Sequence, residues 1–390
     1  MGINKKKRYI DIDVESKAKE RIRYLYETFD NVAVSFSAGK DSTAMLLLTI
    51  EVAQELGKLP VRVIFFDEEA IHPPTIEYAQ RVSNRPDVDF EWYCLPFKHR
   101  NACSNDSPFW YCWDPEKVNL WVRDMPSQGI HQHDCFSIGD TFVDFSDKLM
   151  KFSNFVLLQG IRTQESMRRF RAVAKKKNEN YIIRKSKGVI YAYPVYDMSS
   201  EDVWRVVANR SEDYNRTYDY FNRTSLYNRL LHQRVCPPYG EEPLRGLWIY
   251  AECFPELWHK MIYRVPGAAT AARYGNTELY SRAEKPEGIT YRQYIESILM
   301  TYSGDHRTFV TKNINAIMEQ HGKKTPDPIP DERPHPLTGV SWAFLAKAAT
   351  RGDFKGRVGQ LSAMEAESEC ERLGITQEQA QKLYGRKGSK

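Results

Sequence analysis

The residues with the clearest chemical potential form the run Ser37-Ala-Gly-Lys-Asp-Ser42, which lies between two apolar segments. Its first three residues are small, so a turn built from them lets backbone N–H groups approach an anion closely. Ser42 or Thr43 is expected to open a helix, whose N-terminus attracts phosphate through unpaired N–H groups and the helix dipole. Lys40 adds a mobile positive charge. The run therefore predicts a site for the phosphates of a nucleotide.

The pair Gly39-Lys40 also occurs in the Walker A loop, but the surrounding residues differ. Walker A is Gly, four residues, then Gly-Lys followed by Ser or Thr. Here Val34 occupies the position of the first glycine, and Asp41 follows the lysine. The run is therefore not a Walker A loop. An ordinary strand-to-helix turn rich in small residues stays an open alternative.

Four further candidates follow segments that read as strands. Asp67 ends one apolar run, and Gly160, Arg162 and Glu165 follow another. Ligands of an open parallel sheet collect at the carboxyl ends of its strands. We expect Gly160 to let the backbone approach a ligand closely, and Arg162 to offer a two-pronged donor to phosphate or sulfate. Glu165 is expected to position Arg162 or the nucleotide.

Magnesium is the metal that this set of residues suggests. Mg²⁺ binds one or two carboxylates together with substrate phosphates, so Asp41 and Asp67 are its candidate ligands.

Asp67, Arg162 and Glu165 also have possible structural roles that involve no ligand. Asp67 can cap the helix that follows it, and Arg162 and Glu165 can form a surface ion pair.

The elements that must position these residues alternate between strand and helix, which predicts an α/β fold with a mostly parallel, Rossmann-like sheet and helices on both faces. Prolines, serines and acidic residues mark where the helices begin. The expected strands span 31–37, 60–67, 88–95, 154–160 and 189–195, and the expected helices span 43–56, 73–83 and a segment that begins after Ser199.

The remaining chain divides by composition. An insertion over 96–153 is rich in aromatic residues, and we expect it to form a partly helical lid or subdomain beside the nucleotide site. We expect a basic N-terminal segment at 1–27, a nucleotide-binding domain at 28–210, a helical region at 211–321, and a Pro-rich linker with a charged helical tail at 322–390.

Length and composition describe a globular protein with a sizeable core. The chain has 390 residues, 42% of them hydrophobic, and a formal net charge of +5. No apolar run approaches the roughly 20 residues that cross a bilayer, and no signal peptide opens the sequence. Seven cysteines without Cys-x-x-Cys spacing argue for reduced thiols. We therefore expect a cytoplasmic protein without membrane contact.

Three motifs together resemble the phosphoadenosine phosphosulfate (PAPS) reductase family, within the PP-loop ATP pyrophosphatase superfamily. They are the run 37–42, Gly160-Ile-Arg-Thr-Gln-Glu-Ser166, and Tyr193-Pro-Val-Tyr-Asp-Met-Ser-Ser-Glu-Asp-Val-Trp204. The PP-loop is Ser-Gly-Gly-x-Asp-Ser, so Ala38 replaces a glycine, a change that a negative φ at this residue would tolerate. The segments 231–240 and 245–248 are similar to a long-chain bacterial and phage subgroup that includes the immunoglobulin-binding regulator A-like proteins.

The resemblance implies an adenine nucleotide α-hydrolase-like fold, ATP or a PAPS-like nucleotide as ligand, Mg²⁺, and cleavage between the α- and β-phosphates. It implies catalytic roles for Lys40, Asp41 and Arg162. The nucleotide would contact a larger set of residues: Ser35, Ser37, Ala38, Gly39, Lys40, Asp41, Ser42, Asp67, Gly160, Arg162 and Glu165.

One departure from the family bears on the chemistry. True reductases use a cysteine in Glu-Cys-Gly-[Ile/Leu]-His, whereas here only Glu252-Cys253 and Glu369-Cys370 approximate it. Acidic neighbours of Cys370 would raise its pKa, which disfavours a nucleophilic thiolate. Adenylyl transfer to, or sulfur-related modification of, an unknown acceptor is the leading expectation. A reductase with an unconventional cysteine, a nucleic-acid sulfur-modification component and a non-catalytic nucleotide sensor are the alternatives.

Two weaker signals concern partners and metals. Residues 162–187 hold ten Lys or Arg and two Glu, which predicts either a polyanion or nucleic-acid contact or a solvated basic loop. A protein partner is a further possibility that the sensor alternative requires. The cysteines and histidines at positions 94, 103, 112, 131, 133 and 135 fit no standard zinc or iron–sulfur spacing.

Overall fold

The computed structural model describes residues 11–104, 106–151, 154–174, 179–185, 188–223, 235, 238–240, 247–274, 285–302, 304–350 and 358–386. The chain folds into two compact units. The first comprises residues 1–99 and 109–265, and the second comprises residues 100–108 and 266–390. The domain boundaries expected from the sequence stay a prediction.

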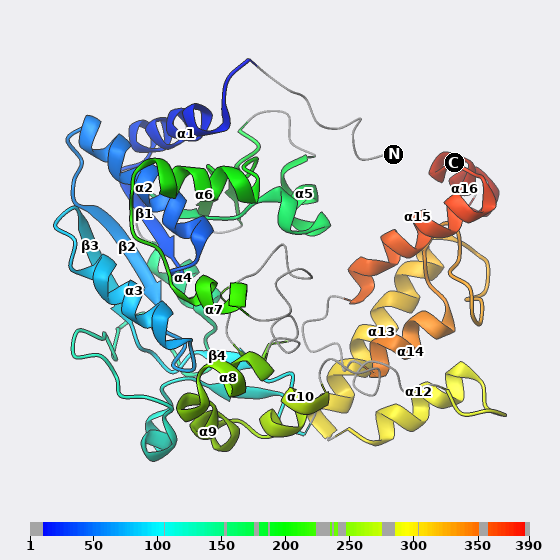
Figure 1. The fold of residues 1–390 in the computed structure, drawn as a ribbon. Helices are drawn as coiled ribbons and strands as arrows, with labels where there is room; N and C mark the ends of the chain where they lie inside the picture. Colours follow the sequence, from blue (N-terminus) through cyan, green and yellow to red (C-terminus); the bar gives the residue numbers. More distant parts are fainter. Residues whose placement is uncertain are drawn as a thin grey trace. The chain divides into compact units, whose positions relative to one another are not determined.

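A six-stranded sheet forms the centre of the first unit, in the order β3-β2-β1-β6-β8-β7 (Figure 1). All neighbouring strands pair in parallel except β7 and β8, which are antiparallel. The expected α/β fold is therefore confirmed. The strands are β1 (Asn31–Phe36), β2 (Val61–Phe66), β3 (Val88–Tyr93), β6 (Phe155–Gln159), β7 (Ile182–Arg184) and β8 (Ile190–Ala192), and β4 (Lys98–Arg100) and β5 (Phe109–Tyr111) form a separate pair.

The helices follow the same order along the chain. Those of the first unit are α1 (Val14–Thr28), α2 (Lys40–Glu55), α3 (Pro73–Ser83), α4 (Phe142–Leu149), α5 (Met167–Ala174), α6 (Ser200–Asn209), α7 (Thr217–Arg223), α8 (Trp248–Cys253) and α9 (Pro255–Arg264). Short 3₁₀ turns span Pro115–Leu120 and Thr163–Glu165.

Helices pack on both faces of the sheet, because successive side chains of each strand point to opposite faces. Phe36 on β1 contacts Phe65 on β2 and Tyr78 on α3. The next residue of β2, Phe66, points to the other face, where its ring packs against Phe145 on α4. Successive residues of a strand face opposite sides, so this one strand divides two apolar layers. The predicted placement of helices on both faces is confirmed.

Two helix starts agree with the sequence and one differs. Pro73 opens α3, and Ser199 caps α6 through a reciprocal pair of hydrogen bonds with Asp202, of 3.1 and 2.8 Å. Helix α2 begins at Lys40, earlier than the expected start at Ser42 or Thr43. The Ser42 hydroxyl donates back to the Gly39 carbonyl at 3.0 Å instead of capping the helix.

Helix α1 was not predicted, and most of it lies in the basic N-terminal segment expected at 1–27. Its Arg21 is 6% exposed and donates to the Pro194 carbonyl at 2.8 Å and to both carboxylate oxygens of Asp197. The guanidinium also lies over the Tyr196 ring. The helix is thus fixed to the Tyr193–Trp204 motif by a buried, bidentate ion pair.

A buried ion pair joins the end of β2 to the last helix of the first unit. Glu69 is 0% exposed and has a φ of 62°, and its carboxylate accepts from Arg264 Nε at 2.8 Å and Nη2 at 2.9 Å. The same carboxylate accepts the backbone N–H of Trp113 at 2.7 Å and of Val122 at 3.1 Å. Glu69 therefore links β2, the aromatic insertion and α9.

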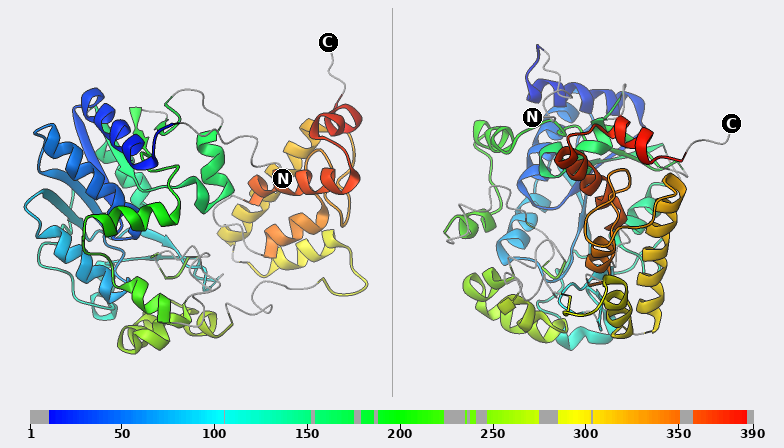
Figure 2. Two further views of the ribbon diagram at one scale, coloured as in Figure 1. Left: turned by 45° about the horizontal axis from the view of Figure 1, so that its top comes forward. Right: turned by 90° about the vertical axis from the view of Figure 1, so that its right-hand side faces the viewer.

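The second unit is helical in the part that the structure describes. Helices α12, α13 and α14 pack side by side around a core that includes Tyr294, Val310 and Leu345 (Figures 1 and 2). Its helices are α10 (Ala268–Tyr274), α12 (Tyr291–Met300), α13 (Gly304–Lys324), α14 (Trp342–Thr350), α15 (Ser362–Leu373) and α16 (Gln377–Tyr384), with a 3₁₀ turn at Val358–Leu361.

Among the described residues, no helix combines the length and the apolar character that crossing a membrane requires.

The Glu69–Arg264 pair leads to a stability prediction. We expect Arg264→Met to lower the free energy of unfolding of the first unit by about 3–5 kcal/mol, because it leaves the buried Glu69 carboxylate without its counter-charge. Urea unfolding followed by tryptophan fluorescence measures this loss.

Arg81→Met is the matched control. Arg81 pairs with Asp213 on the surface, where the two side chains are 45% and 38% exposed, so its loss should cost less than about 1 kcal/mol. Equal losses in the two variants would contradict the importance of the buried pair.

Candidate functional site

The run Ser37–Ser42 lies where β1 ends and α2 begins, at the carboxyl edge of the sheet. The Ser37 backbone N–H donates to the Ser42 hydroxyl at 3.2 Å, and the two serine hydroxyls lie 3.1 Å apart. These contacts close the turn, while the Ser37 side chain stays exposed. The 16-residue helix α2 thus begins directly after a tightly wound loop in which Ser37 is exposed and Ala38, Gly39 and Lys40 are buried.

Two residues from beyond α6 support the loop. The Lys40 backbone N–H donates to the Tyr218 hydroxyl at 2.9 Å, and the Asn215 side-chain amide donates to the Ala38 carbonyl at 2.9 Å. Asn215 is 1% exposed and its amide also donates to Thr75 at 2.9 Å. The loop conformation is therefore held by buried hydrogen bonds from other elements.

Ala38 stands where the PP-loop motif has a glycine, and this change was expected to be tolerated only if the φ of Ala38 were negative. Its φ is 55°, in the left-handed region, whereas tolerance required a negative φ. An L-residue with a Cβ pays about 1–2 kcal/mol for this conformation. The fully buried Ala38 therefore sits in a backbone conformation that glycine would adopt without this cost.

Arg162 connects all three motifs. It is 1% exposed, and its Nε donates to Asp41 Oδ1 at 2.5 Å. Its Nη atoms donate to the Gln164 side chain at 3.1 Å, to the Met198 carbonyl at 3.4 Å and to the Ser200 hydroxyl at 3.2 Å. In this arrangement the guanidinium positions protein groups. Its expected role as a phosphate ligand stays a prediction.

Asp41 lies between two cations. Its Oδ1 accepts from Arg162, and its Oδ2 lies 3.2 Å from Lys40 Nζ. The Lys40 side chain is 5% exposed, and its ammonium lies 5.7 Å from the centre of the Tyr218 ring. Asp41 therefore holds both positive charges close to the first turn of α2.

Gly160 is closely approached by the backbone of α2, and its expected role of letting the backbone approach a ligand stays a prediction. A Cβ at this position would lie 2.8 Å from the Asp41 carbonyl carbon and 2.8 Å from the Ser42 nitrogen. The end of β6 therefore packs directly against the backbone of the first turn of α2. Glu165 lies in the same segment, where its carboxylate accepts the Arg162 backbone N–H at 3.0 Å and pairs with Arg169.

Asp67 is fully buried and surrounded by donors. Its carboxylate accepts from the Trp92 indole at 2.8 Å, from the Glu69 backbone N–H at 2.9 Å and from the Arg123 guanidinium. The Cys94 thiol lies 3.8 Å away. This donor set suits a hydrogen-bonded buried carboxylate rather than a directly bound metal ion, and the Mg²⁺ assignment stays a prediction.

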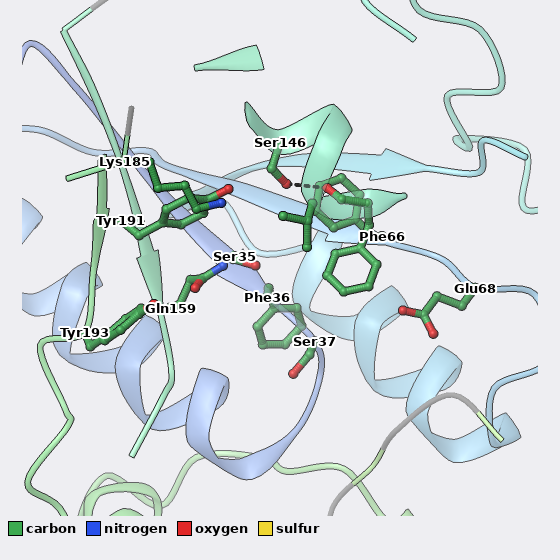
Figure 3. A pocket seen from close by; sticks show the side chains of 12 residues that line it. Ser35, Phe36, Ser37, Phe66, Glu68, Ser146, Gln159, Lys185, Tyr191 and Tyr193 are labelled. Atoms are coloured by element: carbon green, nitrogen blue, oxygen red, sulfur yellow. Dashed lines mark hydrogen bonds between the residues drawn. The ribbon is translucent and has the colours of Figure 1, made fainter. Parts of the chain in front are cut away.

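A pocket of about 260 Å³ lies beside the loop at the carboxyl ends of β1, β2, β6 and β8 (Figure 3). Its wall combines residues of the loop region, the strand ends and α4: Ser35, Phe36, Ser37, Phe66, Glu68, Phe142, Val143, Ser146, Gln159, Lys185, Tyr191 and Tyr193. Two predicted contact residues, Ser35 and Ser37, thus line it. Helix α4 shows that the aromatic insertion contributes to the pocket wall.

Glu68 is a pocket residue that the sequence analysis missed. Its side chain is half-buried, and its Oε2 atom is shielded from solvent without a hydrogen-bond partner among the described residues. Burial, and then the neighbouring Asp67 carboxylate, raise the pKa of Glu68 to about 8. The acidic triplet 67–69, directly after a buried strand, was the signal that could have identified it.

Five of the six described thiols have a raised pKa, which disfavours the nucleophilic thiolate. Burial raises the pKa of Cys94, Cys103, Cys112 and Cys253. Burial, and then Glu369, raise that of Cys370, in the direction that the sequence predicted. Cys236 lies outside the described residues. Within the described part of the chain, no group of three or more His, Cys, Asp or Glu side chains is arranged to hold a metal ion.

The basic segment 162–187 is only partly described, because residues 175–178 and 186–187 lie outside the described ranges. Lys185 pairs with Asp147 at 3.1 Å, and Arg184 lies 3.7 Å from Glu179. Arg169 pairs with Glu165. Binding of a polyanion by this segment stays a prediction.

The sequence matches two families. Residues 31–224 match the phosphoadenosine phosphosulfate reductase domain, and residues 228–325 match a domain of unknown function (DUF3440). The uncharacterized protein YbdN of Escherichia coli strain K12 is 32% identical over 306 residues, which are 73% of this chain and 74% of that protein. Most of the subgroup motifs at 231–240 and 245–248 lie outside the described residues.

Two solved structures share a similar fold at low similarity. A PAPS reductase from Candida auris, in a phosphate complex, is 15% identical with a TM-score of 0.29, and the match covers 54% of this chain and 94% of that one. An FMN adenylyltransferase from Candida glabrata, in complex with FAD and pyrophosphate, is 12% identical with a TM-score of 0.35, covering 55% and 64%. Similarity at this level carries neither activity to this chain.

The φ of Ala38 leads to a prediction about the loop. We expect Ala38→Gly to raise the free energy of unfolding by about 0.5–1 kcal/mol, because relief of the left-handed strain exceeds the added entropy of the unfolded chain. Ala44→Gly in the interior of α2 should instead lower it by about 1 kcal/mol or more. Urea titrations compare the two variants, and destabilisation by both would contradict the strained conformation.

Gly160 provides a second prediction for the loop. We expect Gly160→Ala to cost about 1–3 kcal/mol of stability, because the new methyl group meets backbone atoms that cannot rotate away. Thermal unfolding measures the loss. Gly304→Ala is the control, since a Cβ there meets nothing within 4 Å. An unchanged unfolding temperature in Gly160→Ala would argue against the close packing.

Proposed function

We propose, from the premise that this chain belongs to the phosphoadenosine phosphosulfate reductase domain family, that its first unit binds ATP or a related adenine nucleotide and cleaves it between the α- and β-phosphates. The observation that carries the proposal is the closed Ser37–Ser42 loop at the first turn of α2, with Lys40 and the pocket beside it. Backbone N–H groups, the helix dipole and the Lys40 ammonium all favour phosphate there.

The proposed reaction transfers the adenylyl group to an acceptor. A nucleophilic atom of the acceptor attacks the α-phosphorus and forms a new bond, and the bond from this phosphorus to the bridging oxygen breaks. The electron pair of that bond leaves with pyrophosphate, and the proton of the acceptor goes to water. Negative charge grows on the leaving pyrophosphate, so the loop N–H groups and Lys40 stabilise the transition state.

Asp41 and Arg162 act in this proposal by positioning. Arg162 fixes Asp41, and Asp41 holds the Lys40 ammonium at 3.2 Å, within the first turn of α2. Preorganised charges of this kind accelerate phosphoryl-type transfer without reorganisation during the reaction. No step is assigned to Mg²⁺, because the carboxylates of both predicted ligands, Asp41 and Asp67, are engaged by protein donors, which does not suit a directly bound metal ion.

The other functions considered for this chain, a reductase, a nucleic-acid-modifying protein and a nucleotide sensor, have different support from the structure. A reductase requires a reactive thiolate, and the raised pKa values of Cys253 and Cys370, the two cysteines that approximate the reductase motif, oppose it. Transfer to nucleic acid is one choice of acceptor within the proposal, and the partly described basic segment supplies its cations. A nucleotide sensor would use the same loop without turnover, so product analysis separates it from the enzyme.

The test incubates the full chain with ATP and Mg²⁺ and identifies the products, with water, nucleic acids and small thiols offered as acceptors. We expect AMP, free or transferred, together with pyrophosphate. Lys40→Met should lower the rate by about 100-fold or more, because one charge aimed at the transition state is lost.

Lys58→Met, on the exposed segment after α2, is the control and should keep the full rate. Thermal unfolding checks that both variants fold. Release of ADP and phosphate, or no turnover with any acceptor, would contradict cleavage between the α- and β-phosphates. Tight ATP binding without products would favour the sensor.

A further inference from the structure

We propose that Glu68 determines the base specificity of the pocket by accepting a hydrogen bond from the 6-amino group of adenine. This inference rests on the proposed nucleotide function and adds to it the residue that distinguishes adenine from other purines. It assigns the Glu68 end of the pocket to the base and the Ser37 side to the phosphates.

The shape of the pocket supports the first half of this assignment. Figure 3 shows Glu68 at one end of the pocket and Lys185, Tyr191 and Tyr193 at the other, with Phe36 and Phe66 between them. The rings of Phe66 and Phe142 have centroids 6.1 Å apart. Flat apolar walls of this kind suit the faces of a planar heteroaromatic ring.

The second half depends on the unsatisfied carboxylate oxygen. Glu68 is the pocket residue with a solvent-shielded side-chain oxygen that lacks a hydrogen-bond partner among the described residues. Leaving such an acceptor unpaired is costly, so a ligand that brings an N–H group is favoured. The edge of adenine presents an amino donor, whereas hypoxanthine and guanine present a carbonyl oxygen at the same ring position.

Charge gives the direction of the ligand in the pocket. Lys185, the basic residue of the pocket lining, lies at the end opposite Glu68, so the lining at the Glu68 end offers no counter-charge to a polyanionic phosphate chain. Lys40 and the first turn of α2 favour the phosphates at the other side of Ser37. An uncharged ring with an amino group therefore fits the Glu68 end better than any phosphate.

The neighbours of Glu68 keep it in place without pairing with it. Asp67 is held by Trp92 at 2.8 Å, and Glu69 is held by Arg264 at 2.8 Å. The flanking carboxylates are thus fixed by the protein, and the carboxylate between them stays available. A residue held in this way distinguishes ligands with little rearrangement.

The experiment measures binding by calorimetry, so it does not depend on turnover, and it is run at pH 9, where the Glu68 carboxylate is ionised and only accepts hydrogen bonds. The ligands are ATP, inosine triphosphate and purine riboside triphosphate, which carry an amino group, a carbonyl oxygen and a hydrogen at the 6-position. We expect the wild-type chain to bind ATP about tenfold or more tightly than the other two, as one hydrogen bond to a carboxylate allows.

The variants separate recognition from a structural role. Glu68→Leu should bind all three nucleotides with similar affinity, within about threefold. Glu68→Gln should keep part of the preference for ATP and bind inosine triphosphate more tightly than wild type, because its amide both accepts and donates. Glu77→Gln, at an exposed position on α3, is the control and should behave as wild type.

Two results overturn the inference, and they are distinguishable. If wild type binds ATP but Glu68→Leu keeps the same ratio of affinities, or weakens all three ligands equally, Glu68 does not recognise the amino group and the proposed function is unaffected. If wild type binds none of the three triphosphates, the proposed function fails and the inference fails with it.

Discussion

The contacts of one buried guanidinium hold the candidate site together. Arg162 is 1% exposed, so its donors need partners within the protein, and they find them in segments far apart in the sequence. Asp41 belongs to the loop, and Ser200 belongs to the first turn of α6. Because a cation removed from water tolerates few arrangements, the end of β6, the start of α2 and the start of α6 can meet in few ways.

In this arrangement Arg162 contributes to the chemistry by positioning other residues. The guanidinium fixes Asp41, which in turn holds Lys40 at the start of α2. Asn215 and Tyr218 fix the loop from its other side. The Lys40 ammonium and the loop beside the pocket are therefore held in place by surrounding buried polar contacts. Such contacts suit a reaction whose main requirement is stabilisation of charge on a leaving pyrophosphate.

The five parallel strands and the helices α2, α3 and α6 were predictable because their signals are local, whereas α1 and β7 were not predicted. Apolar runs such as 31–37 and 154–160, and caps such as Ser199, depend on neighbours within a few residues. The Glu69–Arg264 pair was not predictable, since its partners are 195 residues apart and nothing in the sequence pattern connects them. The positive φ of Ala38 was not predicted either, because alanine as a residue type favours a negative φ.

The contacts of Arg264 cross the boundary between the two family matches. It falls in the 228–325 match to the domain of unknown function, yet its guanidinium neutralises a carboxylate of the 31–224 reductase match. The part of the second match that precedes residue 266 therefore belongs to the core of the first unit. A fragment that ended with the first match at residue 224 would keep the buried Glu69 and lose the guanidinium that neutralises it, so the family boundary is not a boundary of folding.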